Sequence, residues 1–281
     1  MTLLRRHHTL PKREPDPVLD FGFAAHTSRR ESPCNTQSAM DDNQQTPRTP
    51  IGDPQEQVPG THQRRGLQIF GFPLRIDLFF FVTAALIGGS QEPLWMLVWV
   101  AVVLTGILAH ELGHAFAGRR LGLEPWIQLM AFGGMTGWMR PRPLTAGQKI
   151  LISAAGPAVG ISIGGAVLVA GFAGVFAGAS PAVLRVLNFV VWVNLGWGVL
   201  NLLPILPLDG GHILASVAGL VAGRKGRIAA LIFSIVLTVA IGLWALSAGQ
   251  WWIGILGVVL TIANVQGLRA EMVPIVPPTV R

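Results

Sequence analysis

The sequence predicts an all-α membrane protein with about six transmembrane helices. Hydrophobic residues make up 51% of the 281 residues, and charged residues make up 12%, about half the share of a typical soluble protein. The apolar residues gather in long segments after residue 66. This composition excludes a coiled coil and an ordinary soluble enzyme. The single cysteine, Cys34, excludes a disulfide scaffold and a zinc cluster built from cysteines.

Residues 1–65 differ in composition from the rest of the chain. They are rich in Pro, Gln, Thr, Asp and Arg, and their longest apolar run is FGFAA. Such a segment cannot bury enough apolar surface to offset the entropy lost on ordering. We therefore expect a disordered cytosolic tail over residues 1–65, followed by a transmembrane domain over residues 66–281. Met40 is an alternative start of the chain.

Six segments after residue 66 are apolar enough to cross a bilayer, which takes about 20 residues of helix. A further apolar stretch, residues 210–222, is too short to span and is expected to form a partly buried or interfacial helix. The predicted spans are 74–90, 95–118, 149–173, 184–204, 227–247 and 251–267.

The basic residues fall on alternate loops between these spans. The loops at 91–94, 174–183 and 248–250 contain no Lys or Arg, whereas the loops on the other side are basic. By the positive-inside rule, we expect both termini in the cytosol of a multi-pass protein of the cell (inner) membrane. The net charge of +7 then reflects loops that face an anionic membrane surface, and no nucleic-acid partner is expected.

The second predicted span contains the string HELGH at residues 110–114. Ionisable side chains inside a bilayer cost at least about 2.5 kcal/mol each, so they mark functional sites. Residues four apart share one face of a helix, so His110 and His114 can hold one zinc ion. Glu111 lies about 100° round the helix and can reach a water on the metal without ligating it. This arrangement is typical of a metalloprotease.

A catalytic zinc site takes a third protein ligand and keeps one position open. The fourth span ends in NLLPILPLDGG, where two prolines break the helix at membrane depth, on the same side as HELGH. Asp209 in this string is the favoured third ligand. His212 and Glu124 are the other candidates, and Glu124 as a ligand would indicate a different fold of membrane zinc protease.

Together, HELGH and NLLPILPLDGG resemble the site-2 protease family of zinc intramembrane proteases over roughly residues 70–268. The resemblance implies that His110, His114 and Asp209 bind one zinc ion and that Glu111 activates water. It also implies that Asn201 helps to bind the carbonyl of the substrate. The sequence shows neither the PDZ domain nor the CBS domain found in branches of the family, so no fused regulatory domain is expected.

The string AFGGMTGW at residues 131–138 resembles the re-entrant β-hairpin of the family, between the second and third spans. Gly133 and Gly134 weaken a helix and suit a hairpin or a close backbone approach. A transmembrane substrate must be unwound before cleavage, and a hairpin edge can pair with the extended stretch. We therefore expect Gly133 and Gly134 to bind substrate.

The AAGPAVG string at 154–160 resembles the small-residue stretch of the family's third span and is expected to serve helix packing.

The expected function is intramembrane zinc proteolysis, in which membrane proteins are cut within or near their transmembrane segments in regulated proteolysis or signalling. The expected partners are a transmembrane protein substrate and the lipid bilayer, and the active site is expected toward the cytosol. An ion or metal transporter is an alternative, but transporters are built from repeated halves and no internal repeat is visible. A catalytically dead scaffold is disfavoured by the intact HELGH string and Asp209.

Overall fold

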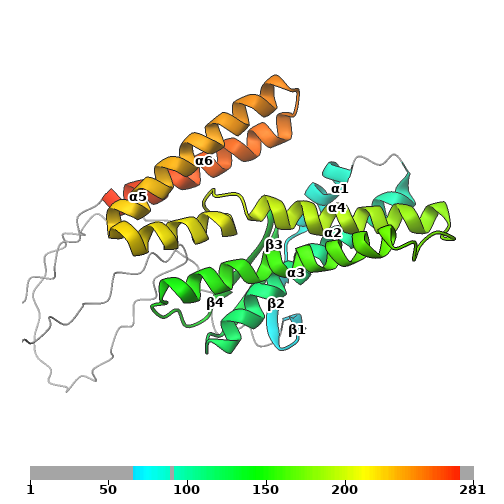
Figure 1. Cartoon of the computed structure of the whole chain (residues 1–281), viewed down its shortest axis with the longest axis horizontal. Coiled ribbons are helices and arrows are strands. Elements are labelled where there is room, and N and C mark those ends of the chain that lie inside the picture. The colour runs from blue at the N-terminus through cyan, green and yellow to red at the C-terminus, as the bar shows by residue number, and fades with distance from the viewer. Residues whose placement is uncertain (1–65, 89–91, 273–281) are drawn as a thin grey trace, which may run out of the picture.

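The computed structural model describes residues 66–88 and 92–272 (Figure 1). The predicted tail over 1–65 and the alternative start at Met40 lie outside the described residues. The elements in chain order are β1 (Gln68–Ile69), β2 (Phe72–Ile76), α1 (Leu78–Gly88), α2 (Pro93–Arg120), β3 (Pro125–Met130), β4 (Gly133–Trp138), α3 (Ala146–Phe172), α4 (Pro181–Asn201), α5 (Asp209–Ser247) and α6 (Trp251–Met272).

Five helices, α2 to α6, are long and apolar enough to cross a membrane. The first predicted span, 74–90, is shorter in the structure, because residues Phe72–Ile76 form strand β2 and leave α1 with 11 residues. A helix of that length is about 16 Å long, shorter than the hydrocarbon core of about 30 Å. The prediction of a mostly helical, polytopic protein is confirmed, and the count of six spans stays a prediction.

Helix α5 joins two elements that the sequence predicted as separate helices. Its 39 residues include both the predicted interfacial helix at 210–222 and the fifth predicted span. The two parts meet at a kink where Ala222 and Gly223 leave helical geometry. Gly223 has a φ of 55°, a left-handed conformation that glycine adopts without steric cost. The first part of α5 therefore runs in a different direction from the second.

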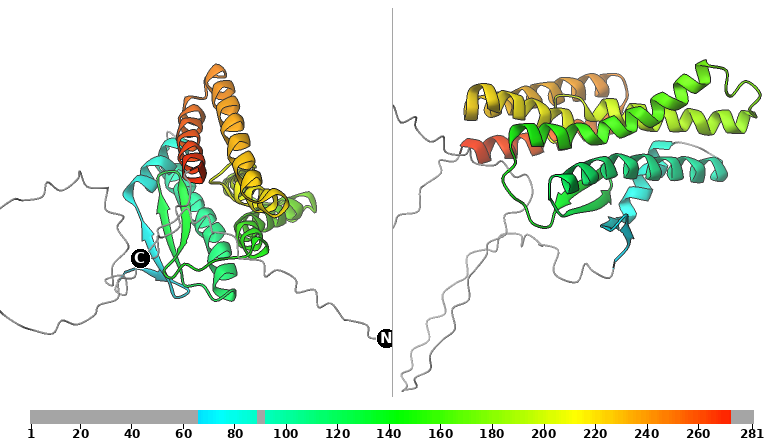
Figure 2. Two further views of the ribbon diagram at one scale, coloured as in Figure 1. Left: turned by 90° about the vertical axis from the view of Figure 1, so that its left-hand side faces the viewer. Right: turned by 60° about the horizontal axis from the view of Figure 1, so that its bottom comes forward.

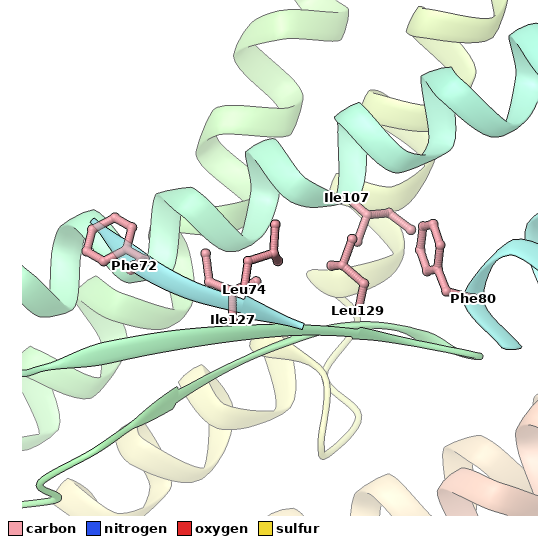
Figure 3. Packing of buried hydrophobic residues seen from close by; sticks show 7 residues of the cluster. Phe72, Leu74, Phe80, Ile107, Ile127 and Leu129 are labelled. Atoms are coloured by element: carbon pink, nitrogen blue, oxygen red, sulfur yellow. The ribbon is translucent and has the colours of Figure 1, made fainter. Parts of the chain in front are cut away.

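A four-stranded sheet lies beside α2, in the order β1-β2-β3-β4. Strands β3 and β4 form the predicted hairpin, in which Leu129 pairs with Gly134. The range 131–138 predicted for the hairpin contains its turn and its second strand, β4, whereas the first strand, β3, precedes that range. Strand β2 pairs parallel with β3 and was not predicted. Buried side chains from β2, α1, α2 and β3 join the sheet to the helices: Phe72, Leu74, Phe80, Ile107, Ile127 and Leu129 (Figure 3).

The remaining helices form two groups. Helices α2, α3 and α4 pack on one another, and α3 also contacts α5. Helix α6 packs mainly on α5, and the two stand side by side as a pair in both views of Figure 2. The irregular loop 202–208 joins the two groups, since it follows α4 and leads into α5. Asp209, the first residue of α5, therefore lies where the two groups meet.

Candidate metal centre

His110 and His114 lie on one face of α2, as their spacing predicts. Both side chains are buried, and their Nε2 atoms are 3.2 Å apart. His110 is ten residues before Arg120 at the end of α2, which places it about 15 Å along the helix from that basic end. The pair is therefore well inside the span and not at its surface.

Asp209 completes a cluster of three possible metal ligands. Its Oδ2 atom lies 3.1 Å from His110 Nε2 and 3.3 Å from His114 Nε2. The carboxylate occupies the first turn of α5, where the positive end of the helix dipole favours a negative charge. Two imidazole nitrogens and one carboxylate oxygen are a ligand set found in catalytic zinc sites. The donors present therefore fit a zinc ion.

A hydrogen bond fixes the orientation of the His114 ring. His114 Nδ1 is 2.7 Å from the backbone oxygen of Ile152 in α3. Because a carbonyl oxygen can only accept, Nδ1 carries a proton, and in the neutral imidazole Nε2 then has a free lone pair. This lone pair faces His110 and Asp209, and such a partner on the far nitrogen is usual for a histidine that binds a metal.

Gly156 of α3 makes room for the histidine pair. A Cβ atom on Gly156 would lie 2.8 Å from His110 Nε2 and still closer to His114 Nε2. Nearby, a Cβ on Gly113 would lie 2.6 Å from the Ala155 oxygen, so α2 and α3 approach here backbone to backbone. Sequence reasoning assigned Gly156 to helix packing alone. The small-residue string at 154–160 pointed to this glycine. That it lies under the histidines depends on how α2 and α3 pack, which the sequence does not show.

Glu111 is buried beside the cluster and is held by strand β4. Its Oε2 atom accepts a hydrogen bond of 2.7 Å from the Thr136 hydroxyl. Ligand atoms of His110, Glu111 and His114 also lie within 4.8 Å of one another, so distance alone would allow Glu111 to bind a metal. Asp209 is the better third ligand, because it contacts both histidines while Thr136 engages the Glu111 carboxylate. Sequence reasoning missed Thr136, although it lies within the string 131–138.

The hairpin glycines lie directly against the site. A Cβ on Gly134 would be 2.7 Å from Glu111 Cδ, and a Cβ on Gly133 would be 2.6 Å from Trp197 Cζ2. Gly133 also has a φ of 131°, which disfavours other residues. The backbone of β4 therefore passes next to Glu111 with no side chain between them.

The other residues singled out in the sequence have other hydrogen-bond or ion-pair partners. Asn201 ends α4, and its Nδ2 donates to the Trp197 oxygen at 3.0 Å, within its own helix. Among the described residues it makes no hydrogen bond to the histidine–aspartate cluster. His212 lies three residues after Asp209 in α5, and its backbone N–H donates to the Leu208 oxygen at 3.1 Å. Glu124 forms a 2.9 Å ion pair with Arg140, and its side chain is 44% exposed, so it is engaged away from the cluster.

Known proteins that are similar to this chain are named as zinc metalloproteases. The family model described as Peptidase family M50 matches residues 162–243, a range that includes Asp209. A Mycobacterium tuberculosis protein named as a zinc metalloprotease is 35% identical over 163 residues, which cover 53% of this chain and 39% of that protein. The chain is thus similar to the M50 (site-2 protease) family over the matched residues. The resemblance noted in the sequence is thereby confirmed.

Two further proteins similar to this chain are also named as zinc metalloproteases. One, from Synechocystis, is 28% identical over 177 residues, covering 57% of this chain and 45% of that protein. The other, from Methanocaldococcus jannaschii, is 28% identical over 159 residues, covering 54% and 44%. The matches thus span less than half the length of these relatives. Their names imply zinc as the metal that the cluster would bind.

A solved structure shares the fold of this chain. The site-2 protease from Methanocaldococcus jannaschii matches with a TM-score of 0.54 and 23% identity, covering 76% of this chain and 98% of that chain. Together with the five apolar helices, this likeness makes the protein an integral membrane protein. The M50 family model does not reach residues 110–114, so the assignment of HELGH rests on the geometry described above.

Proposed function

We propose that the protein is an intramembrane zinc endopeptidase that cleaves membrane proteins within or near their transmembrane segments, in regulated proteolysis or signalling. The observation that supports this best is the convergence of His110 Nε2, His114 Nε2 and Asp209 Oδ2 within 3.3 Å of one another. These donors lie among apolar helices, with the buried carboxylate of Glu111 beside them. Buried ionisable groups in such a place are expected to serve chemistry.

In this proposal one zinc ion per chain is held by His110, His114 and Asp209. When bound, zinc supplies polarisation of the scissile carbonyl and activation of water. Glu111 takes the proton from the attacking water and delivers it to the leaving amine. The Thr136 hydroxyl donates to Oε2 of Glu111, which leaves Oε1 as the oxygen that accepts the proton. The burial of Glu111 limits access of bulk water to these steps.

Strand β4 is the proposed docking edge for the substrate. It is an outer strand of the sheet, so an unwound substrate segment can add to it as a further strand. Gly133 and Gly134 have no side chains, and this lets the substrate backbone come close to Glu111. An extended segment bound here presents its peptide bonds to the site one after another.

Asn201 is proposed to donate a hydrogen bond to the substrate carbonyl or to the oxyanion that develops from it. The amide nitrogen of asparagine has two N–H groups. One N–H of Asn201 is engaged by the Trp197 oxygen. The proposed role therefore uses the second N–H, while the first fixes the amide on α4.

The proposed orientation places both termini and the active site on the cytosolic side of the cell membrane. It rests on the basic loops and on Arg119 and Arg120, which end α2 on the side nearer to the metal centre. Reporter fusions at residues 92 and 281 should report opposite compartments, with 281 cytosolic. Finding both reporters in one compartment would contradict the six-span orientation.

The test of the proposed function is cleavage of a panel of single-span test proteins co-expressed with the native chain. Fragments should appear with the native chain, and metal flux across vesicles that contain the purified protein should stay at the level of empty vesicles. The alternative function, transport, predicts the reverse. Metal flux that depends on Glu111, together with no cleavage of any panel member, would overturn the protease proposal.

A further inference from the structure

The loop that leads to Asp209 is irregular, and its middle residues Ile205 and Leu206 are buried. It covers residues 202–208, between the end of α4 and the start of α5, and it contains Pro204 and Pro207. Backbone groups freed from a helix inside a membrane need other partners, because no water is present to satisfy them. The partners of this loop therefore also determine where Asp209 lies.

Within this loop, Leu206 forms backbone hydrogen bonds with side chains that are distant in the sequence. Its N–H donates to Ser234 Oγ at 3.2 Å, and its carbonyl accepts a hydrogen bond from Asn264 Nδ2. Ser234 belongs to the second part of α5 and Asn264 to α6, and the two are 0% and 1% exposed. Both backbone polar groups of one loop residue are thus satisfied by the α5–α6 pair.

Leu206 is tightly connected to Asp209. The Leu208 N–H donates to the Ile205 oxygen at 2.8 Å, which closes a turn around Leu206. Gly211, in the first turn of α5, packs so closely on the backbone of Ile205 and Leu206 that a Cβ atom there would overlap them. A shift of Leu206 therefore moves the first turn of α5, and the Asp209 carboxylate with it.

Helix packing alone does not account for Asn264. Its Nδ2 also donates to Leu260 within α6, while its Oδ1 has no hydrogen-bond partner among residues 66–88 and 92–272. Burying an unpaired acceptor costs free energy, so an apolar residue would serve packing better at this position. The hydrogen bond to Leu206 is the contact that an apolar residue could not make.

We propose that Asn264 and Ser234 are positioning residues for Asp209. By holding the two polar groups of Leu206, they keep Oδ2 of Asp209 within reach of both histidines, so α6 acts on the metal centre without touching it. This inference rests on the proposed function, because it assumes that Asp209 is a zinc ligand.

The test is the zinc affinity of the purified full chain, measured by competition with a chelator. Asn264→Leu keeps the size of the side chain but cannot donate, and it should weaken zinc binding about 10-fold, as loss of an outer partner of a metal ligand does. Thr261→Val is the matched control. It removes a 3.0 Å hydrogen bond to Thr238 between the same two helices, away from the loop, and should leave zinc affinity unchanged.

Two further readouts separate positioning from general destabilisation. Asn264→Gln keeps the amide donor and adds one methylene group, so it should recover most of the zinc affinity. The extra methylene has room in a small cavity, which is lined by Leu206, Pro207, Leu231, Ala263 and Asn264. With Co²⁺ in place of zinc, Asn264→Leu should change the visible spectrum of the bound ion, and Thr261→Val should not. If Asn264→Leu does not fold, Ser234→Ala against Thr261→Val gives the same test.

Equal zinc affinity and equal Co²⁺ spectra for the native chain, Asn264→Leu and Ser234→Ala would overturn the inference. An equal loss in Thr261→Val would also overturn it, because the effect would then belong to helix packing. A native chain that binds no zinc is a different result, since it would overturn the proposed function itself.

Discussion

The two regions that supply the metal donors are built in different ways. His110 and His114 lie in an unbroken helix, where a spacing of four residues is enough to place both on one face. Asp209 follows an irregular loop, in which the Leu206 N–H donates a hydrogen bond to Ser234 and the Leu206 carbonyl accepts one from Asn264. Changes near α2 should therefore act by direct contact with the site, whereas changes near the loop should act through its backbone.

Gly156→Ala should have the largest effect on the helix-borne donors. The added Cβ would lie 2.8 Å from His110 Nε2 and still closer to His114 Nε2, so both rings would have to shift. We expect zinc affinity to fall by about 100-fold, the upper range for changes next to metal ligands. Chelator competition measures this loss. Gly165→Ala is the control on the same helix, because its Cβ would meet nothing within 4 Å. Equal affinities in the two variants would remove Gly156 from the site.

Thr136→Val should have a smaller effect, on cleavage and not on zinc. Valine keeps the shape of threonine but cannot donate to the Glu111 carboxylate. A hydrogen bond to a charged group is worth about 1.5 kcal/mol or more, so cleavage of a test substrate should fall about 10-fold. Thr105→Val, at an exposed position on α2, is the control. A loss of zinc in Thr136→Val would instead indicate that Glu111 is a ligand.

Removal of residues 1–39 should have the smallest effect of all. This part of the chain contains none of the residues assigned to the metal centre, and its composition disfavours a packed core. A chain that begins at Met40 should cleave the test substrate at the native rate. Loss of cleavage at unchanged expression would show that the segment recruits substrate.

The parts of the site that follow local rules could be predicted from the sequence. The facing histidines and the offset Glu111 follow from the helix period, and the placement of Asp209 follows from the two prolines that end an apolar span. Each of these patterns depends only on residues that are close together in the sequence. The structure adds that Asp209 and both histidines lie within 3.3 Å of one another.

Features that depend on distant contacts could not be predicted in the same way. The apolar string FPLRI suits a span as well as a strand, and it becomes β2 because it pairs with β3, where Leu74 meets Ile127. The contact of Thr136 with Glu111 and the space that Gly156 leaves for the histidines are likewise tertiary. The first hairpin strand, PWIQLM, alternates buried and less buried residues. The sequence does not show this alternation, because Trp126 and Met130 on the less buried face are apolar like Ile127 and Leu129 on the buried one.

The most direct test of the account compares the two carboxylates, one from each region. Zinc content and cleavage of a co-expressed single-span protein are measured for Glu111→Gln and Asp209→Ala. Glu111→Gln should keep about one zinc per chain while cleavage falls at least ~10²-fold, the loss expected for a general base. Asp209→Ala should lose most of its zinc, because one of three ligands is gone. Full zinc in Asp209→Ala with zinc lost in Glu111→Gln, or undiminished cleavage by Glu111→Gln, would contradict the assignment of the two roles.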